Sequence, residues 1–167
     1  MSEIELRIHI YGEKSLRKKS SRVRKVGKQE RDLLKKMAEV MYSSGGIGLA
    51  APQVGINRQM IVVDVGQGLC QLINPKVLKK DGSLIMQEGC LSLPEVCVNI
   101  KRAKKVFIEY TDENNKKISF WADNLFSRAV QHEIDHLKGK LIVDYVNLLK
   151  RMSIRKRFKK QLKKGIK

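Results

Sequence analysis

The sequence is poor in cysteine, proline, histidine and aromatic residues, and it has no long apolar run. It contains three cysteines, three prolines and three histidines among 167 residues. No apolar run approaches the roughly 20 residues that span a bilayer, and residues 1–5 lack the pattern of a secretory signal. Membrane-spanning and secreted classes are therefore not expected. With 42% hydrophobic residues, a folded cytoplasmic protein is expected instead.

The three cysteines cannot all pair with one another, so a ligand or a free thiol is expected rather than a disulfide framework. Cys70 and Cys97 lie in apolar segments, and we expect both to be small buried hydrophobic residues. Cys90 follows a glycine in the segment Glu88-Gly89-Cys90 and needs separate consideration.

Acidic residues are few relative to basic ones. The chain has 35 Lys and Arg against 17 Asp and Glu, which gives a formal net charge of +18. Such a balance indicates an anionic partner, usually nucleic acid, although a solubilising surface or adaptation to an unusual cytoplasm are alternatives. The basic residues gather in residues 14–36 and after residue 147, and this uneven distribution favours a partner.

The apolar periodicity predicts a mixed fold. Spacings of three and four predict a helix over residues 29–42. Short β-branched runs predict strands at 59–65 and 105–111, with turns at 81–82 and 112–115. Because no segment of crossover-helix length separates the strands, we expect an α+β fold with antiparallel sheets rather than a doubly wound sheet.

Two further helices are expected in the C-terminal third. Asp123 is expected to cap a helix over residues 124–138, which Gly139 ends. A strongly basic helix is expected from about residue 148, where apolar residues recur every four positions. The apolar residues on two faces of the first of these helices indicate that it is central and buried.

That helix contains His132-Glu133-Ile134-Asp135-His136. Histidines four residues apart on a helix point the same way, so both imidazoles can bind one ion. Glu133 lies beside the first histidine, where a carboxylate can act as a general base without being a ligand. The pattern alone also matches many unrelated proteins, so two surface histidines flanking a glutamate remain an alternative.

Two upstream segments support the metal-site interpretation. A zinc-type hydrolase site has three protein ligands and an open position, and no histidine follows His136. Cys90 is therefore a candidate third ligand, because a metal-bound thiol is deprotonated. The segment from Gly46 to Gly55 is rich in small residues and contains Gln53, an uncharged donor suited to a developing oxyanion.

Together these three segments closely resemble the signature motifs of the peptide deformylases, in the family order. Here the motifs stand as Gly46-Ile47-Gly48-Leu49-Ala50-Ala51-Pro52-Gln53-Val54-Gly55, Glu88-Gly89-Cys90-Leu91-Ser92-Leu93-Pro94 and Gln131-His132-Glu133-Ile134-Asp135-His136-Leu137-Lys138-Gly139. The resemblance extends over nearly the whole chain. It implies one domain, with residues 1–147 as the catalytic part and residues 148–167 as a basic C-terminal helix.

The resemblance also implies roles for individual residues. The metal would be bound by Cys90, His132 and His136. Catalysis would use Glu133 as general base and then acid, with the Gln53 side chain and the Leu91 backbone N–H stabilising the oxyanion. The substrate main chain and methionine side chain would be held by Ile47, Gly48, Met86, Gly89, Leu125 and Ala129. Arg102 and Arg128 would be structural.

The implied reaction removes formyl from the N-terminal methionine of nascent polypeptides and releases formate. The implied cofactor is one divalent ion per chain, with Fe²⁺ expected and Zn²⁺, Ni²⁺ or Co²⁺ as alternatives. A monomer is expected. Relatives often have glycine at Asn124, where asparagine would favour the helix start, and some have a substrate-binding arginine just past the second motif, where this chain has Glu95-Val96-Cys97-Val98-Asn99.

The basic C-terminal helix is expected to dock on the ribosome through ribosomal RNA phosphates. The residues expected to make this contact are Lys150, Arg151, Arg155, Lys156, Arg157, Lys159 and Lys160. A solvated helix whose apolar stripe packs on the domain, or a membrane-surface helix, are alternatives. For the whole chain, the competing hypotheses are an endopeptidase that uses the same histidine pair and a non-enzymatic RNA-binding protein.

Overall fold

The computed structural model describes residues 6–163, apart from the side chains of residues 161 and 162. Its helices and strands are α1 (Lys28–Ser43), β1 (Gly48–Ala50), β2 (Met60–Val63), β3 (Cys70–Asp81), β4 (Leu84–Cys90), β5 (Leu93–Arg102), β6 (Lys105–Thr111), β7 (Lys117–Asp123), α2 (Asn124–Leu137) and α3 (Leu148–Lys163), with short 3-10 turns at Lys14–Arg17, Ala51–Val54 and Ile142–Tyr145.

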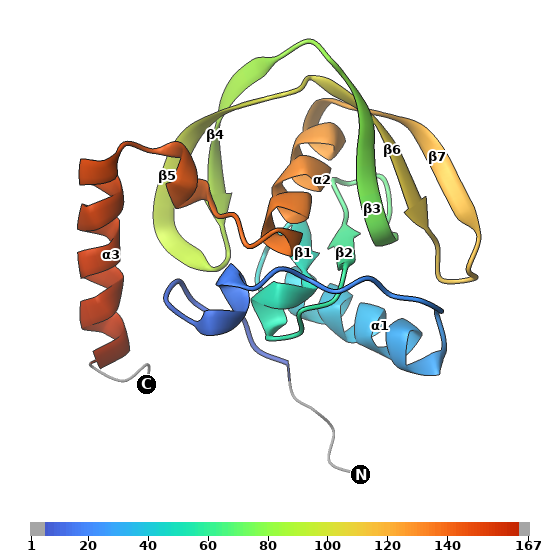
Figure 1. Ribbon diagram of the computed structural model, residues 1–167, viewed down its shortest axis with the longest axis horizontal. Coiled ribbons are helices and arrows are strands. Elements are labelled where there is room, and N and C mark those ends of the chain that lie inside the picture. The colour runs from blue at the N-terminus through green and yellow to red at the C-terminus, as the bar shows by residue number, and fades with distance from the viewer. Residues whose placement is uncertain (1–5, 164–167) are drawn as a thin grey trace.

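The strands form two antiparallel sheets, one with the order β1-β2-β3-β6-β7 and one made of β4 and β5. Helix α2 lies at the centre, between β4 and β5 on one side and the larger sheet on the other (Figure 1). The expected α+β fold with antiparallel sheets around a central helix is confirmed. None of the helices within residues 6–163 has the length and apolarity to cross a membrane.

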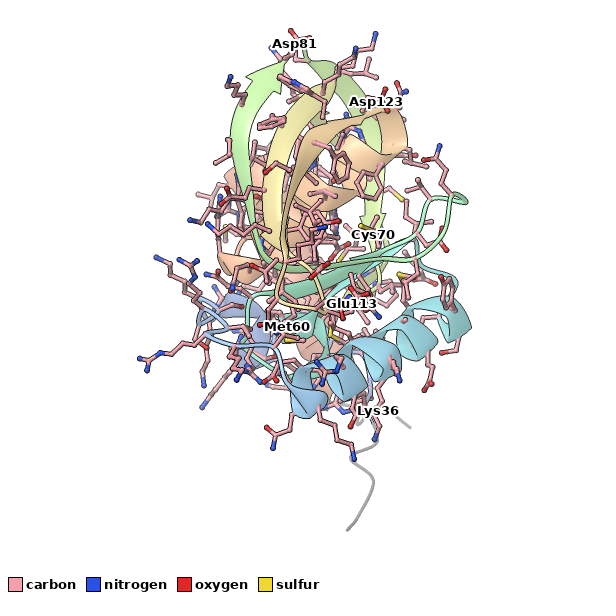
Figure 2. All side chains as sticks on the ribbon, turned by 90° about the vertical axis from the view of Figure 1, so that its right-hand side faces the viewer. Lys36, Met60, Cys70, Asp81, Glu113 and Asp123 are labelled. Atoms are coloured by element: carbon pink, nitrogen blue, oxygen red, sulfur yellow. The ribbon has the colours of Figure 1, made fainter. Side chains whose placement is uncertain are left out.

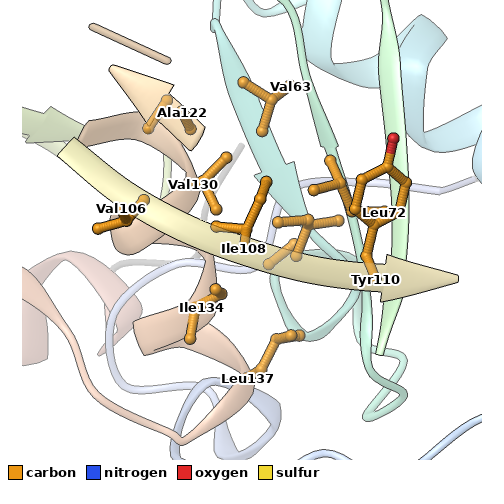
Figure 3. Close-up of a cluster of buried hydrophobic side chains, with 12 residues drawn as sticks. Val63, Leu72, Val106, Ile108, Tyr110, Ala122, Val130, Ile134 and Leu137 are labelled. Carbon is orange, nitrogen blue, oxygen red and sulfur yellow. The ribbon is translucent and has the colours of Figure 1, made fainter. Parts of the chain in front are cut away.

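The main core joins α2 to the larger sheet. Val130, Ile134 and Leu137 of α2 pack against buried side chains of the sheet that include Leu72 and Ile108 (Figure 3). The α2 residues recur at spacings of three and four, so they share the face that the sheet covers. This packing fixes the opposite side of α2 toward β4, where its histidines lie.

Helix α1 and the sheet ends lie at opposite edges of the molecule. In the side view, α1 runs along one edge with Lys36 pointing outward, while Asp81 and Asp123 mark the ends of β3 and β7 at the other (Figure 2). Each of these two residues aligns with Lys105 of β6, which places β3, β6 and β7 in register at that edge.

Helix α3 packs against the domain through apolar side chains, chiefly Phe158. Phe158 is 2% exposed and meets the Tyr11 ring edge-on, with centroids 5.6 Å apart. Ile154 packs against the same cluster, which also contains Leu16 and Leu93. The apolar stripe of α3 therefore covers the domain at these two positions; the side chain of Leu162 and residues 164–167 lie outside the described residues.

Two details of the sequence prediction are wrong. Cys97 is exposed, because burial in β5 alternates and Val96, Val98 and Ile100 take the inward positions. Asp123 makes no capping hydrogen bond through its side chain at the start of α2. Asn124 has a left-handed φ of 49°, so the position suits glycine or asparagine for its backbone conformation rather than for helix propensity.

Candidate active site

Cys90, His132 and His136 bring three metal-ligating atoms together. Helical spacing predicts this for the two histidines, and the family resemblance implies it for Cys90. The Cys90 Sγ lies 3.3 Å from the His136 Nε2, which lies 3.2 Å from the His132 Nε2. Both histidines stand one turn apart on α2, and Cys90 ends β4. All three donor atoms lie within 4.8 Å of one another.

The donor set fits a divalent ion. Two nitrogens bound to one tetrahedral ion at about 2.1 Å lie roughly 3.4 Å apart. The Nε2 atoms of His132 and His136 are 3.2 Å apart, which is close to this value. Thiolate and imidazole ligands suit iron, cobalt, nickel and zinc. With three protein ligands, such a site keeps a position open for reactants, which is the arrangement of catalytic rather than structural sites.

A buried carboxylate orients the first histidine. Glu88 Oε2 lies 3.0 Å from His132 Nδ1, so that ring nitrogen is occupied and Nε2 faces the other ligands. Arg102 donates two hydrogen bonds to Glu88, at 2.6 and 2.9 Å, and Arg128 donates another. Burial opposes ionisation, but the hydrogen bonds from His132 and Arg102 outweigh it and lower the pKa of Glu88 to about 2.

The network extends from Arg102 to a second acid, Asp135 of α2. The Arg102 Nη1 donates to Asp135 at 2.8 Å, and the Tyr145 hydroxyl donates to the same carboxylate oxygen at 2.6 Å. Arg102 is 6% exposed and thus links two acids in the interior. The expectation that Arg102 and Arg128 are structural agrees with these contacts.

Glu133 projects toward the space beside the metal-ligating group. Its Oε2 is buried, and within residues 6–163 no group hydrogen-bonds to it. A Cβ added at Gly48 would overlap the Glu133 carboxylate, so only glycine leaves room for it. Burial raises the pKa of Glu133 to about 7, against the opposing charges of His132 and Arg102.

Gln53 is held with its amino group toward the ligands. The backbone N–H of Ala50 donates to Gln53 Oε1 at 2.9 Å, which fixes the amide orientation. Its Nε2 then faces Cys90 Sγ at 3.6 Å and donates to Ser92 Oγ at 3.2 Å. Gln53 is 1% exposed. The amide is therefore a preorganised donor at the edge of the site.

A cavity of about 400 Å³ opens over these groups. It is bounded by β4 on one side and by α2 on the other, with the turn before β1 and Leu91 completing its wall. All the residues predicted to hold substrate line it: Ile47, Gly48, Met86, Gly89, Leu125 and Ala129. Ile47, Met86 and Leu125 are each more than 40% exposed, so an apolar surface leads into the cavity.

The sequence interpretation missed four site residues. It gave no role to Glu88, which orients His132. Ser92 is fully buried and accepts the hydrogen bond from Gln53. Asp135 and Tyr145 complete the Arg102 network. The sequence contained a signal for a role of Asp135, because this residue lies inside the histidine motif, one helical turn from Gln131. It contained no signal for Tyr145, because only the fold brings Tyr145 to Asp135.

The basic residues of α3 lie away from this cavity, and all those predicted to bind the ribosome are exposed except the half-buried Arg151. Arg157 donates to the Pro94 carbonyl at 2.9 Å, and Arg151 donates to the carbonyls of Val143 and Asp144. These two arginines fasten α3 to the domain through backbone carbonyls.

The family model described as polypeptide deformylase matches residues 5–152. This chain belongs to the peptide deformylase family. A peptide deformylase of Thermodesulfovibrio yellowstonii is 42% identical over 159 residues, which cover 92% of this chain and 96% of the relative. One from Endomicrobium trichonymphae is 39% identical and covers 96% of this chain and 98% of its own length.

Solved structures of deformylases agree with the fold. The Thermotoga maritima peptide deformylase has a TM-score of 0.83 at 38% identity, covering 85% of this chain and 97% of that one. The Ehrlichia chaffeensis enzyme in complex with actinonin has a TM-score of 0.90 at 32% identity, covering 93% and 96%. The chain is thus a metal-dependent hydrolase of the deformylase class, with a Cys-His-His group able to hold the metal.

Proposed function

We propose that this chain hydrolyses the N-formyl group from the N-terminal formyl-methionine of nascent polypeptides and releases formate. Membership of the deformylase family supports the reaction. The observation that carries the assignment of residues is the buried Glu133 Oε2, which has no hydrogen-bond partner among the described residues and lies beside the Cys90, His132 and His136 donors. A base and a metal-ligating group share one small cavity there.

Cys90, His132 and His136 would hold the metal, and Fe²⁺ is our assignment for the native ion, with Zn²⁺, Ni²⁺ or Co²⁺ able to replace it. When bound, the ion acts as a Lewis acid and lowers the pKa of a coordinated water molecule. Glu88 keeps His132 in the tautomer that presents Nε2, since its carboxylate occupies Nδ1.

Glu133 carries the proton in this mechanism. It accepts a proton from the attacking water as the oxygen–carbon bond to the formyl group forms. It then donates that proton to the leaving nitrogen as the carbon–nitrogen bond breaks, which yields formate and a free N-terminus. A pKa near 7 lets the same carboxyl accept and then give up a proton at neutral pH.

Gln53 and Leu91 supply hydrogen-bond donors for the oxyanion. The Gln53 amino group is fixed by Ala50 and needs no reorientation during the reaction. The Leu91 backbone N–H follows Cys90 directly and is our second donor. Both belong to residues that line the cavity.

The cavity wall would select the methionine side chain. Ile47, Met86, Leu125 and Ala129 provide apolar surface against which this side chain can pack. The substrate main chain would lie extended between the Gly48 and Gly89 segments and add to β4 in a strand-like mode. Since β4 pairs with β5 along one edge, its other edge faces the cavity.

An anaerobic assay of formate release from a formyl-methionyl tripeptide, with iron(II) supplied, tests this function. Stoichiometric formate with an intact tripeptide is the expected result. Cleavage of the internal peptide bonds would instead indicate an endopeptidase, and the absence of formate under these conditions would refute the proposal.

We also propose that the chain is a cytoplasmic monomer that docks on the ribosome through α3, while residues 1–167 act as one domain. Exposed Lys150, Lys156, Lys159 and Lys160 form a cationic surface suited to ribosomal RNA. Replacing the last three with glutamine should weaken ribosome sedimentation without changing tripeptide turnover. Unchanged sedimentation would refute the docking role of α3.

A further inference from the structure

A second cavity of about 880 Å³ lies behind α2, on the side away from the metal-ligating group. Gln131, Ile134, Asp135 and Lys138 line it, and their spacing of three and four places them on one helix face. Neither His132 nor His136 lines this cavity. The other walls come from β3 and from the end of β5, which flank α2 on its two sides (Figure 1).

The cavity is surrounded by positive charge. Its lysines, all exposed, are Lys19, Lys76, Lys80, Lys101, Lys138 and Lys140. No described carboxylate forms an ion pair with any of them. The one acid in the lining, Asp135, is already bound by Arg102 and Tyr145. The Lys140 ammonium lies over the Tyr145 ring, 3.8 Å from its centroid. Six lysines thus line one concave surface, and none of them has a carboxylate partner among the described residues.

A second basic cavity adjoins the first. This cavity, of about 780 Å³ beneath α3, contains Arg17 and Lys18, while Lys19 lines the cavity behind α2. Arg17 donates to the Gly139 carbonyl at 3.1 Å. Lys138 and Lys140, which flank Gly139, both line the first cavity. The two basic surfaces therefore meet at this contact. A small anion would occupy one of them, whereas a polymer of phosphates can follow both.

We propose that the cavity behind α2 binds the phosphate backbone of RNA, as a contact separate from the α3 lysines. The choice of RNA among polyanions rests on the proposed action on nascent chains, because ribosomal RNA surrounds such chains as they emerge. The cavity behind α2 and the formyl-peptide cavity share no lining residue. Both ligands can therefore be bound at the same time.

The test uses the metal-loaded full chain and a fluorescent 12-nucleotide single-stranded RNA, followed by anisotropy over a salt series. One variant carries Lys76→Gln, Lys80→Gln and Lys138→Gln. A matched control carries Lys28→Gln, Lys35→Gln and Lys116→Gln, which removes three exposed lysines that line neither basic cavity. Net charge falls by the same amount in both variants.

We expect the cavity variant to bind RNA more weakly, with the slope of log K against log salt reduced by about 2, since each lost contact to a single strand removes roughly 0.7. The control should keep the wild-type slope. Equal losses in the two variants would overturn the proposal, as would complete displacement of the RNA by millimolar ATP, which would indicate a site for a small phosphate ligand.

Formate release from the tripeptide, measured on the same samples, separates this inference from the proposed function. Both triple variants should retain wild-type turnover, because none of the six lysines touches the formyl-peptide cavity. Normal turnover with unchanged RNA binding in the cavity variant refutes only the RNA contact. If the wild-type protein releases no formate, the proposed deformylase function is refuted whatever the RNA result.

Discussion

Replacing Glu88 with glutamine removes one negative charge from the centre of a buried network while preserving side-chain volume. The carboxylate of Glu88 accepts two hydrogen bonds from Arg102, one from Arg128 and one from His132 Nδ1. Its side chain is 6% exposed, and those of the two arginines are 5% and 7% exposed. The substitution would leave two guanidinium groups in the interior with one remaining acid, Asp135, bound to Arg102.

The structure supports an estimate of the cost by two routes. Removing one partner of a buried ion pair destabilises by about 3–5 kcal/mol, because the other charge stays buried and uncompensated. Independently, the pKa of Glu88 falls from 4.5 to about 2 on folding. At 1.36 kcal/mol per unit, this corresponds to about 3 kcal/mol of stability. We therefore expect the Glu88→Gln protein to lose about 3 kcal/mol of unfolding free energy at neutral pH.

The same pKa shift sets the pH dependence of this loss. Because the folded-state pKa is lowered, the stabilisation by Glu88 is fully present above its unfolded pKa of 4.5. It disappears as the pH falls from about 4.5 toward 2. The difference in stability between wild type and Glu88→Gln should therefore shrink as the pH falls below about 4.5. Because the Glu88 carboxylate also helps to raise the pKa of His132, part of the difference should be lost as the pH rises above the ordinary pKa of histidine.

Urea denaturation of both proteins, stripped of metal so that binding does not add to stability, measures this difference. Glu95→Gln is the matched control, because Glu95 is 82% exposed and 3.7 Å from Arg157, and it should change stability by less than about 0.5 kcal/mol. A loss below about 1 kcal/mol in Glu88→Gln, or a difference that grows in acid, would contradict the reasoning. Metal titration should also show roughly 10- to 100-fold weaker binding, since His132 loses its orienting partner.

Two further substitutions probe the site and the anchoring of α3. Gly48→Ala should place a methyl group against the Glu133 carboxylate and lower kcat by about 10²-fold with metal content unchanged, because small displacements of catalytic groups are costly. Wild-type turnover in this variant would contradict the placement of Glu133. Phe158→Ala should destabilise the protein by about 3–5 kcal/mol in urea denaturation, because the ring is buried against Tyr11, and should leave kcat near wild type. A loss of unfolding free energy below about 1 kcal/mol would show that Phe158 does not anchor α3.

The secondary structure was predictable where periodicity and local chemistry agree. The strand over residues 105–111 has the observed bounds of β6, and the predicted helix over residues 124–138 matches α2 within one residue. Gly139 ends α2 with a φ of 73°, as a C-terminal glycine should. The metal-ligating histidines were equally accessible, because helical spacing alone places them on one face.

The remaining features depend on contacts between distant segments. The exposure of Cys97 follows from the register of β5, which an apolar neighbourhood does not reveal. The link from Tyr145 to Asp135 and Arg102 joins three elements that sequence spacing cannot relate. The cavity behind α2 likewise gathers lysines from four separate segments, so the sequence showed the charge of the chain but not where it is concentrated.

The central claim is that Glu133 moves the proton at a site whose metal is held by Cys90, His132 and His136. Anaerobic kcat for formate release by iron-loaded Glu133→Ala, with the metal content measured on the same sample, tests this claim most directly. The mechanism predicts one ion per chain in both wild type and variant, and a loss of kcat of about 10²- to 10⁴-fold. Equal kcat in the two proteins would contradict the account.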